Sequence, residues 1–170
     1  MPEKLIYVLR HAKSSRDDPE LADHDRPLNP RGRQAAQLMA ERMRRERVAP
    51  ALVLCSSARR ARETLVPIEQ TLGPKAKIKV EDGLYAAGAP QLLERLRRAP
   101  ESVPSVMIIG HNPAIQEFAV QLVGDQAARV RLASKFPTAA LATLSIGTLR
   151  WPELRTGGAE LVAFLTPRNA

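Results

Sequence analysis

Two of the three histidines in the sequence lie one residue beyond the end of a short run of apolar, strand-forming residues. His11 comes after Arg10, and His111 comes after Gly110, a residue that lets a chain turn sharply or a ligand approach closely. A neutral imidazole with one nitrogen held by a backbone acceptor presents the other nitrogen as a nucleophile. An adjacent arginine favours the neutral ring and can clamp a phosphate through two hydrogen bonds.

A third polar signature follows another apolar run. Ser56-Ser57 ends that run, and Arg59, Arg60 and Arg62 come next, at the start of an expected helix. Such a cluster is usually a solvated helix face, but after a buried strand one arginine can reach over the sheet edge. Two arginines and two histidines would make a cationic pocket for a tetrahedral dianion. The sequence has no Walker motif, Rossmann glycine pattern or nucleophile elbow, which argues against nucleotide-binding and ester-hydrolase readings.

Apolar runs and amphipathic stretches alternate along the chain. They predict strands at 4–9, 52–55, 78–80, 106–109, 140–146 and 160–165, and helices at 31–46, 59–72, 90–98 and 114–123. This order predicts an α/β three-layer sandwich with a mainly parallel central sheet flanked by helices. Because no helix separates the last two strands, one strand is expected to run antiparallel. Ligands of such sheets lie at the carboxyl ends of strands, where all three polar signatures fall.

Two segments near the first histidine have distinctive patterns. Residues 12–30 are polar and contain three prolines, which predicts a long loop of the kind that often carries function. In the helix that follows, Ala35, Leu38, Met39 and Met43 recur at three- and four-residue steps and predict its apolar face.

Composition bounds the class of protein. A chain of 170 residues with 44% hydrophobic and 26% charged residues is typical of one globular domain, here 1–170. The lone Cys55 excludes an internal disulfide and a cysteine-rich zinc site, and it fits a reducing cytoplasm. No signal peptide and no apolar run of spanning length is apparent, so a cytoplasmic protein without a membrane partner is expected.

The formal net charge of +8 suits several anionic partners, among them nucleic acid and phosphorylated proteins. Only 4% of the residues are aromatic, so a stacking surface for single strands is poorly supplied. The sequence also lacks RNA-recognition and zinc-finger patterns, and we expect no nucleic-acid partner.

Three motifs together resemble those of the histidine phosphatase superfamily. The segment 9–12, Leu-Arg-His-Ala, is similar to its Arg-His-Gly signature, and Gly110-His111-Asn112-Pro113 is similar to its second-histidine motif. The segment 56–64 resembles its Ser…Arg-Ala-x-x-Thr motif, and alignment on Ala61 and Thr64 places the phosphate-binding arginine at Arg60. The motifs come in the family's order and cover most of the chain.

Within this superfamily the chain is most similar to the small SixA-type phosphohistidine phosphatases. The segments 10–15, Arg-His-Ala-Lys-Ser-Ser, and 25–32, Asp-Arg-Pro-Leu-Asn-Pro-Arg-Gly, support this comparison. The resemblance implies a phosphoglycerate mutase-like fold without a large cap, in a single histidine phosphatase domain. It also implies a hydrolase that uses no metal and no cofactor.

The resemblance assigns roles to individual residues. His11 would attack phosphorus to form a phosphohistidine that water then hydrolyses, while Arg10, Arg60 and His111 hold the phosphoryl oxygens. Larger members of the family use a carboxylate after the third strand as general acid, which alignment on the following tyrosine places at Asp82. A neighbouring carboxylate, Glu81, or no acid at all, remains open.

The favoured substrate is phosphohistidine on a signalling or phosphotransfer protein, with phosphate or oxyanion analogues as ligands. One alternative is a phosphatase of small phosphomonoesters. Another is a non-catalytic phosphate-binding module, although such a module has no need of the nucleophile His11. A nucleic-acid binder is a third alternative, which salt-dependent DNA binding without phosphatase activity would favour. A mutase is disfavoured because the chain lacks the length for a closing cap.

Overall fold

The structure is a computed structural model that describes residues 2–168. Within these residues, six strands form one sheet in the order β3-β2-β4-β1-β5-β6. The strands are β1 (Lys4–Arg10), β2 (Leu52–Ser56), β3 (Lys77–Glu81), β4 (Ser105–Gly110), β5 (Leu141–Gly147) and β6 (Glu160–Leu165). β1, β2, β3 and β4 run parallel, and β5 runs antiparallel to both of its neighbours. The predicted α/β class, with a mainly parallel sheet and one antiparallel strand, is confirmed.

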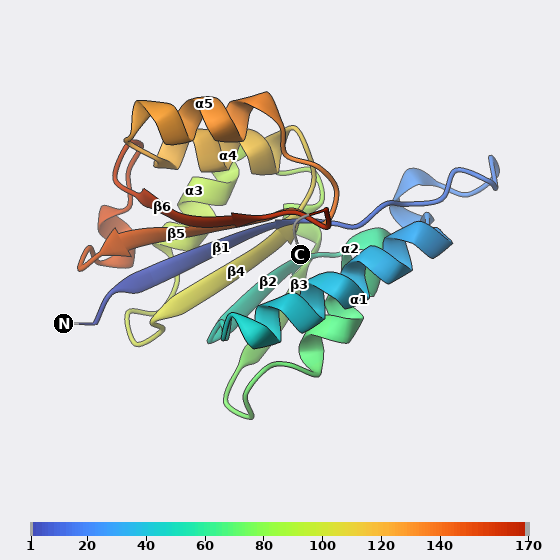
Figure 1. Cartoon of the computed structure of the whole chain (residues 1–170), viewed down its shortest axis with the longest axis horizontal. Coiled ribbons are helices and arrows are strands. Elements are labelled where there is room, and N and C mark those ends of the chain that lie inside the picture. The colour runs from blue at the N-terminus through green and yellow to red at the C-terminus, as the bar shows by residue number, and fades with distance from the viewer. Residues whose placement is uncertain (1, 169–170) are drawn as a thin grey trace.

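Helices cover both faces of the sheet (Figure 1). α1 (Pro30–Arg45) and α2 (Arg59–Glu69) lie on one side, and α3 (Ala89–Arg97), α4 (Ala114–Leu122) and α5 (Gln126–Ser134) lie on the other. Alternate residues of β1, β2 and β4 pack into the two cores on opposite faces of the sheet, because successive side chains in a strand point to opposite faces. In β1, Ile6 and Val8 pack with the α3–α5 side, whereas Tyr7 and Leu9 pack with α1 and α2.

α1 forms where the sequence predicts it, but a different face is buried. Asn29 caps the helix by accepting a hydrogen bond from the Gly32 backbone N–H, and Pro30 occupies the first turn. The small residues Ala36 and Ala40 are buried beside two methionines of the predicted face. Leu38, which the pattern placed on the apolar face, is 49% exposed. Alanines in the buried stripe let the helix lie close to the sheet.

The predicted long loop after β1 folds back on itself. Ser14 and Leu28 form an isolated antiparallel bridge, and a 3-10 turn at Asp23–Asp25 lies between them. The start of this loop packs tightly against the first turn of α1. A Cβ added to Gly32 would lie only 2.0 Å from the Lys13 carbonyl oxygen, so there is no room for a larger residue. The first turn of α1 therefore fixes where the loop leaves the sheet.

α5 is the one α-helix of the described residues that the sequence pattern does not predict. Leu132 is its only buried residue, and Val130 is 58% exposed, so the segment has little of the apolar periodicity that marks a helix. Asp125 caps it by accepting from the Ala128 backbone N–H. No helix within residues 2–168 combines the length and the apolar character needed to cross a bilayer.

Candidate active site

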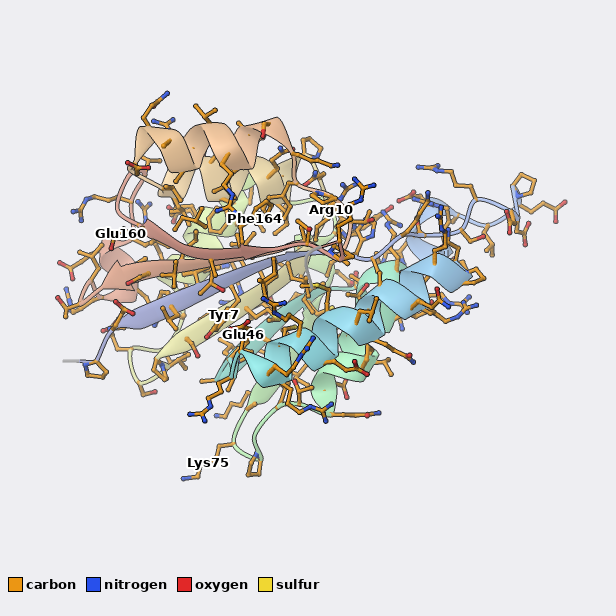
Figure 2. All side chains as sticks on the ribbon, in the orientation of Figure 1. Tyr7, Arg10, Glu46, Lys75, Glu160 and Phe164 are labelled. Carbon is orange, nitrogen blue, oxygen red and sulfur yellow. The ribbon has the colours of Figure 1, made fainter. Side chains whose placement is uncertain are left out.

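The three polar signatures meet at the carboxyl edge of the sheet. β4 pairs with both β1 and β2, and Arg10 lies opposite Gly110 in the register. Figure 2 shows Arg10 at the end of β1, where the long loop leaves the sheet, and Glu160 at the far end. A cavity of about 340 Å³ opens here. Its lining residues are Arg10, His11, Lys13, Ser14, Arg16, Asp23, Arg26, Arg60, His111, Asn112 and Thr138.

Five of these side chains are cationic, whereas Asp23 is the one carboxylate among them. This balance suits a multiply charged anion. A larger and more apolar groove of about 400 Å³ lies between α1 and α2, but its lining contains neither a histidine nor a cysteine. The chemistry therefore belongs to the cationic cavity.

His11 is held as a neutral imidazole with one free nitrogen. Its Nδ1 lies 2.6 Å from the Ala12 carbonyl oxygen, so Nδ1 carries the proton and Nε2 keeps its lone pair. The side chain is only 8% exposed. Burial, together with the smaller effects of the nearby His111, Arg60 and Arg10, lowers the pKa of His11 to about 3. Nε2 is therefore unprotonated at neutral pH, as a nucleophile must be.

Two arginines present unpaired donors beside this ring. Arg10 donates from Nη1 to the Phe136 carbonyl oxygen, over 3.0 Å. Arg60 donates from Nη1 to the Asp23 carbonyl oxygen, over 2.7 Å, and from Nη2 to the Asp23 carboxylate, over 3.0 Å. The Nε atom of each arginine is buried and has no partner within residues 2–168. Buried polar groups are rarely left unpaired, so these two N–H groups are unsatisfied donors on side chains that line the cavity.

Arg60, rather than its neighbour Arg59, lines the cavity. Arg59 is exposed and pairs with Glu63 one turn along α2, with 2.8 Å between Nε and Oε2. Arg62 donates to the Ser57 carbonyl oxygen. The arginine that the motif alignment selected, Arg60, is therefore the one of the three that lines the cavity.

His111 completes the group of cavity residues that sequence reasoning selected. Its ring centroid lies 5.0 Å from that of His11. Nε2 lies 2.7 Å from the Ser56 hydroxyl oxygen, and Nδ1 is buried without a partner in the described residues. Burial, and then the charge of Arg60, lower the pKa of His111 to about 4. This second ring is therefore also neutral at physiological pH.

Gly110 does not serve a sharp turn, which is one of the two roles expected of it. Its φ is not positive, unlike those of Gly147 and Gly157, so a sharp turn does not explain it. A Cβ at this position would lie 3.0 Å from Cγ1 of Ile115. The glycine allows α4 to pack closely at the end of β4, beside His111.

Asp23 is a site residue that sequence reasoning does not single out. Its carboxylate accepts hydrogen bonds from Arg60, from Arg26 and, over 2.5 Å, from the Tyr85 hydroxyl. The Tyr85 hydroxyl and the two guanidinium groups hold the pKa of Asp23 well below its ordinary range, and the carboxylate in turn raises the pKa of Tyr85. Asp23 is thus ionised at neutral pH. Its position in a loop with several other aspartates gave no signal that distinguished it.

The structure does not bring Asp82 to the cavity. Asp82 is exposed, in the 3-10 turn Asp82–Leu84 after the edge strand β3, and it is absent from the cavity lining. Its neighbour Glu81 is engaged elsewhere, because both carboxylate oxygens accept from Arg95 over 2.8 Å. This pairing lowers the pKa of Glu81. Of the five predicted site residues, the structure therefore gathers Arg10, His11, Arg60 and His111.

A family model for the histidine phosphatase superfamily (branch 1) matches residues 6–92, just over half of the chain. The chain belongs to that superfamily. An uncharacterised protein of Mycobacterium tuberculosis is 37% identical over 164 residues, which cover 94% of this chain and all of the relative. The phosphohistidine phosphatase SixA of Escherichia coli is 26% identical over 153 residues, covering 86% of this chain and 91% of SixA.

Solved structures show the same SixA-like architecture. A candidate SixA phosphohistidine phosphatase from Nakamurella multipartitia superimposes with a TM-score of 0.86 at 29% identity, covering 98% of each chain. Another, from Agrobacterium tumefaciens, gives a TM-score of 0.83 at 31% identity and covers 98% of this chain and 99% of its own. The expected likeness to SixA-type members, and with it a phosphatase of the hydrolase class, is supported.

Proposed function

We propose that this protein is a phosphohistidine phosphatase that works through a covalent phosphohistidine on His11. The observation that carries the proposal is the state of His11, a buried neutral ring whose Nδ1 is bonded to the Ala12 carbonyl oxygen. His11 lines a cavity together with Arg10 and Arg60, whose Nε groups have no partner within residues 2–168.

The reaction proceeds in two displacements at phosphorus. In the first, the Nε2 lone pair of His11 forms a bond to phosphorus while the bond from phosphorus to the substrate's imidazole nitrogen breaks. The departing imidazole keeps that electron pair and takes a proton from solvent. In the second, water attacks phosphorus, the bond to Nε2 breaks, and inorganic phosphate leaves with His11 again neutral.

Charge on the phosphoryl oxygens is stabilised by donors that are already in place. Within residues 2–168, the Nε–H groups of Arg10 and Arg60 are buried without a partner, and His111 lines the same cavity. Preorganised donors of this kind stabilise developing negative charge without reorganisation. We propose that these three residues perform this task without a metal ion.

Leaving-group chemistry supports phosphohistidine as the substrate. Among the cavity residues the only carboxyl group, that of Asp23, is ionised and has no proton to donate, and Asp82 lies elsewhere. An alkoxide leaving group needs protonation, whereas an imidazole departs with little help. The names of the SixA relatives agree with this choice. The cationic lining favours an acidic partner, which we propose to be a phosphotransfer or signalling protein in the cytoplasm.

The test compares substrates by kcat/KM. The panel contains a histidine-phosphorylated phosphotransfer protein, a sugar phosphate and a chromogenic phosphate ester. We expect the phosphoprotein to be preferred, and His11→Ala to remain folded without turnover of any of them. Equal or higher kcat/KM for the small esters would instead support a phosphomonoesterase. Near-normal turnover by His11→Ala would overturn the covalent mechanism.

A further inference from the structure

Ser56 is a fully buried polar residue at the end of β2 that the mechanism above does not use. Its hydroxyl oxygen lies 2.7 Å from Nε2 of His111 and accepts a 3.2 Å hydrogen bond from the Ala58 backbone N–H. Ser56 therefore contacts one ring nitrogen of His111, Nε2. The other ring nitrogen, Nδ1, has no partner within residues 2–168.

The hydroxyl proton of Ser56 has one available acceptor. A serine hydroxyl has a single proton to donate and two lone pairs to accept. One lone pair is used by Ala58, and within residues 2–168 the only other partner of this oxygen is Nε2 of His111. If Nε2 carried the ring proton, the serine proton would be left buried without a partner, which is costly. The serine therefore donates and Nε2 accepts.

The ring proton of His111 then belongs on Nδ1. Because His111 is neutral at physiological pH, its ring has one N–H group, and an accepting Nε2 leaves that group at Nδ1. The position of the ring proton decides whether Nδ1 attracts or repels an anion. An Nδ1–H attracts a phosphoryl oxygen, whereas an Nδ1 lone pair repels it.

We propose that Ser56 is a positioning residue that fixes His111 as the Nδ1–H tautomer, so that His111 donates a neutral hydrogen bond to the phosphoryl group. This inference rests on the proposed function for its role in catalysis. The tautomer itself is a property of the resting protein and can be tested without any substrate.

Ser57 provides a matched control. It is the next residue and is also buried, at 8% exposure. Its hydroxyl lies 2.9 Å from Nε2 of His24, and within residues 2–168 it makes no hydrogen bond to His111. A Ser57→Ala variant therefore removes a neighbouring buried hydroxyl while leaving the proposed tautomer control intact.

The experiment is a ¹⁵N NMR measurement of the three histidine rings at neutral pH, in wild type, Ser56→Ala and Ser57→Ala. In wild type and Ser57→Ala we expect His111 to show a protonated Nδ1 and an unprotonated Nε2. In Ser56→Ala we expect a shift of the ring proton toward Nε2. Wild-type His111 protonated at Nε2, or an unchanged Nδ1–H tautomer in Ser56→Ala, would overturn the proposal.

Binding of inorganic phosphate and of tungstate provides a second readout. Ser56→Ala should raise both dissociation constants by roughly 3- to 10-fold, the equivalent of one hydrogen bond, and Ser57→Ala should leave them unchanged. Ser56→Cys, whose thiol is a weaker donor, should fall between serine and alanine. Equal binding by wild type and Ser56→Ala would count against the proposal.

The two proposals fail in different ways. If wild type hydrolyses no phosphohistidine substrate yet shows the Nδ1–H tautomer and its loss in Ser56→Ala, the proposed function is wrong while the assignment of Ser56 stands. If wild type is active but His111 carries its proton on Nε2, the function stands and the assignment of Ser56 is wrong. The wild-type spectrum decides this point even if Ser56→Ala does not fold.

Discussion

Replacing Arg60 by lysine separates the charge of the guanidinium group from its geometry. The wild-type side chain is only 7% exposed and makes two hydrogen bonds to Asp23, while its Nε has no partner in the described part of the chain. A lysine ammonium keeps the charge, but it cannot reproduce the rigid fork of donors. The variant therefore retains long-range attraction for an anion and loses the oriented donor.

The expected magnitude follows from this loss. Removing one donor to a transition-state oxyanion costs roughly 10²–10³ in kcat, about 3–4 kcal/mol. We expect Arg60→Lys to lose about 10² in kcat. KM should change less than kcat, because the retained charge still attracts the phosphate in the ground state. Steady-state kinetics with a phosphohistidine protein, together with thermal unfolding to confirm folding, measure both values.

Arg59→Lys is the matched control for this experiment. Arg59 is the adjacent residue, but it is exposed and pairs with Glu63 on the surface of α2. Such pairs contribute roughly 0–1 kcal/mol to stability, and this one has no contact with the cavity. We expect Arg59→Lys to have the same kcat and KM as the wild type. Full activity in Arg60→Lys, or a large loss in Arg59→Lys, would refute the assignment of the phosphate-binding arginine.

Four further predictions concern the pH dependence of activity, the pH dependence of stability, packing and metals. The pKa values of His11 and His111 are lowered to about 3 and about 4, so kcat/KM corrected for substrate ionisation should stay nearly constant from pH 7 to 5. A roughly 30-fold fall in kcat/KM over this range would show that the nucleophile has the ordinary histidine pKa. In the unfolded chain His11 takes up a proton below about pH 6.5, whereas in the folded protein it does not. Lowering the pH from 7 to 5 should therefore reduce the free energy of unfolding by roughly 2 kcal/mol through His11 alone, which urea titration at the two pH values measures. Gly32→Ala should lower Tm, because the added Cβ would lie 2.0 Å from a backbone oxygen. Gly73→Ala is the control, because a Cβ there meets nothing within 4 Å. Equal Tm values for the two variants would contradict the tight packing under the loop. Dialysis against a chelator should leave kcat unchanged, and a loss that a divalent cation restores would exclude the metal-free mechanism.

The strands and their polar ends could be predicted from the sequence because each depends on local patterns. A buried strand such as β4 is a continuous apolar run, and the residues after it fall at the sheet edge by topology alone. His11, Arg10 and His111 were therefore accessible to sequence reasoning. Choosing Arg60 over Arg59 required the family motif, since both begin the same helix.

The remaining features depend on contacts that local patterns do not encode. Asp23 meets Arg60 across 37 residues of sequence and Tyr85 across 62, through the way the long loop folds back. Asp82 fits the position of a carboxylate after the third strand, but β3 is an edge strand and its following turn faces solvent. α5 escaped prediction because it buries only Leu132, although Asp125 is a recognisable cap.

The central claim is that the phosphoryl group passes through His11, and trapping that intermediate tests it most directly. Wild-type protein is mixed with a ³²P-labelled phosphohistidine protein and quenched in alkali within milliseconds, since phosphohistidine survives alkali better than acid. Peptide mapping then locates the label. We predict label on His11 in wild type and none on the His11→Ala variant, with the label lost from wild type as inorganic phosphate appears. Phosphate release by wild type with no label on His11 at any time, or with label on another residue, would contradict the mechanism.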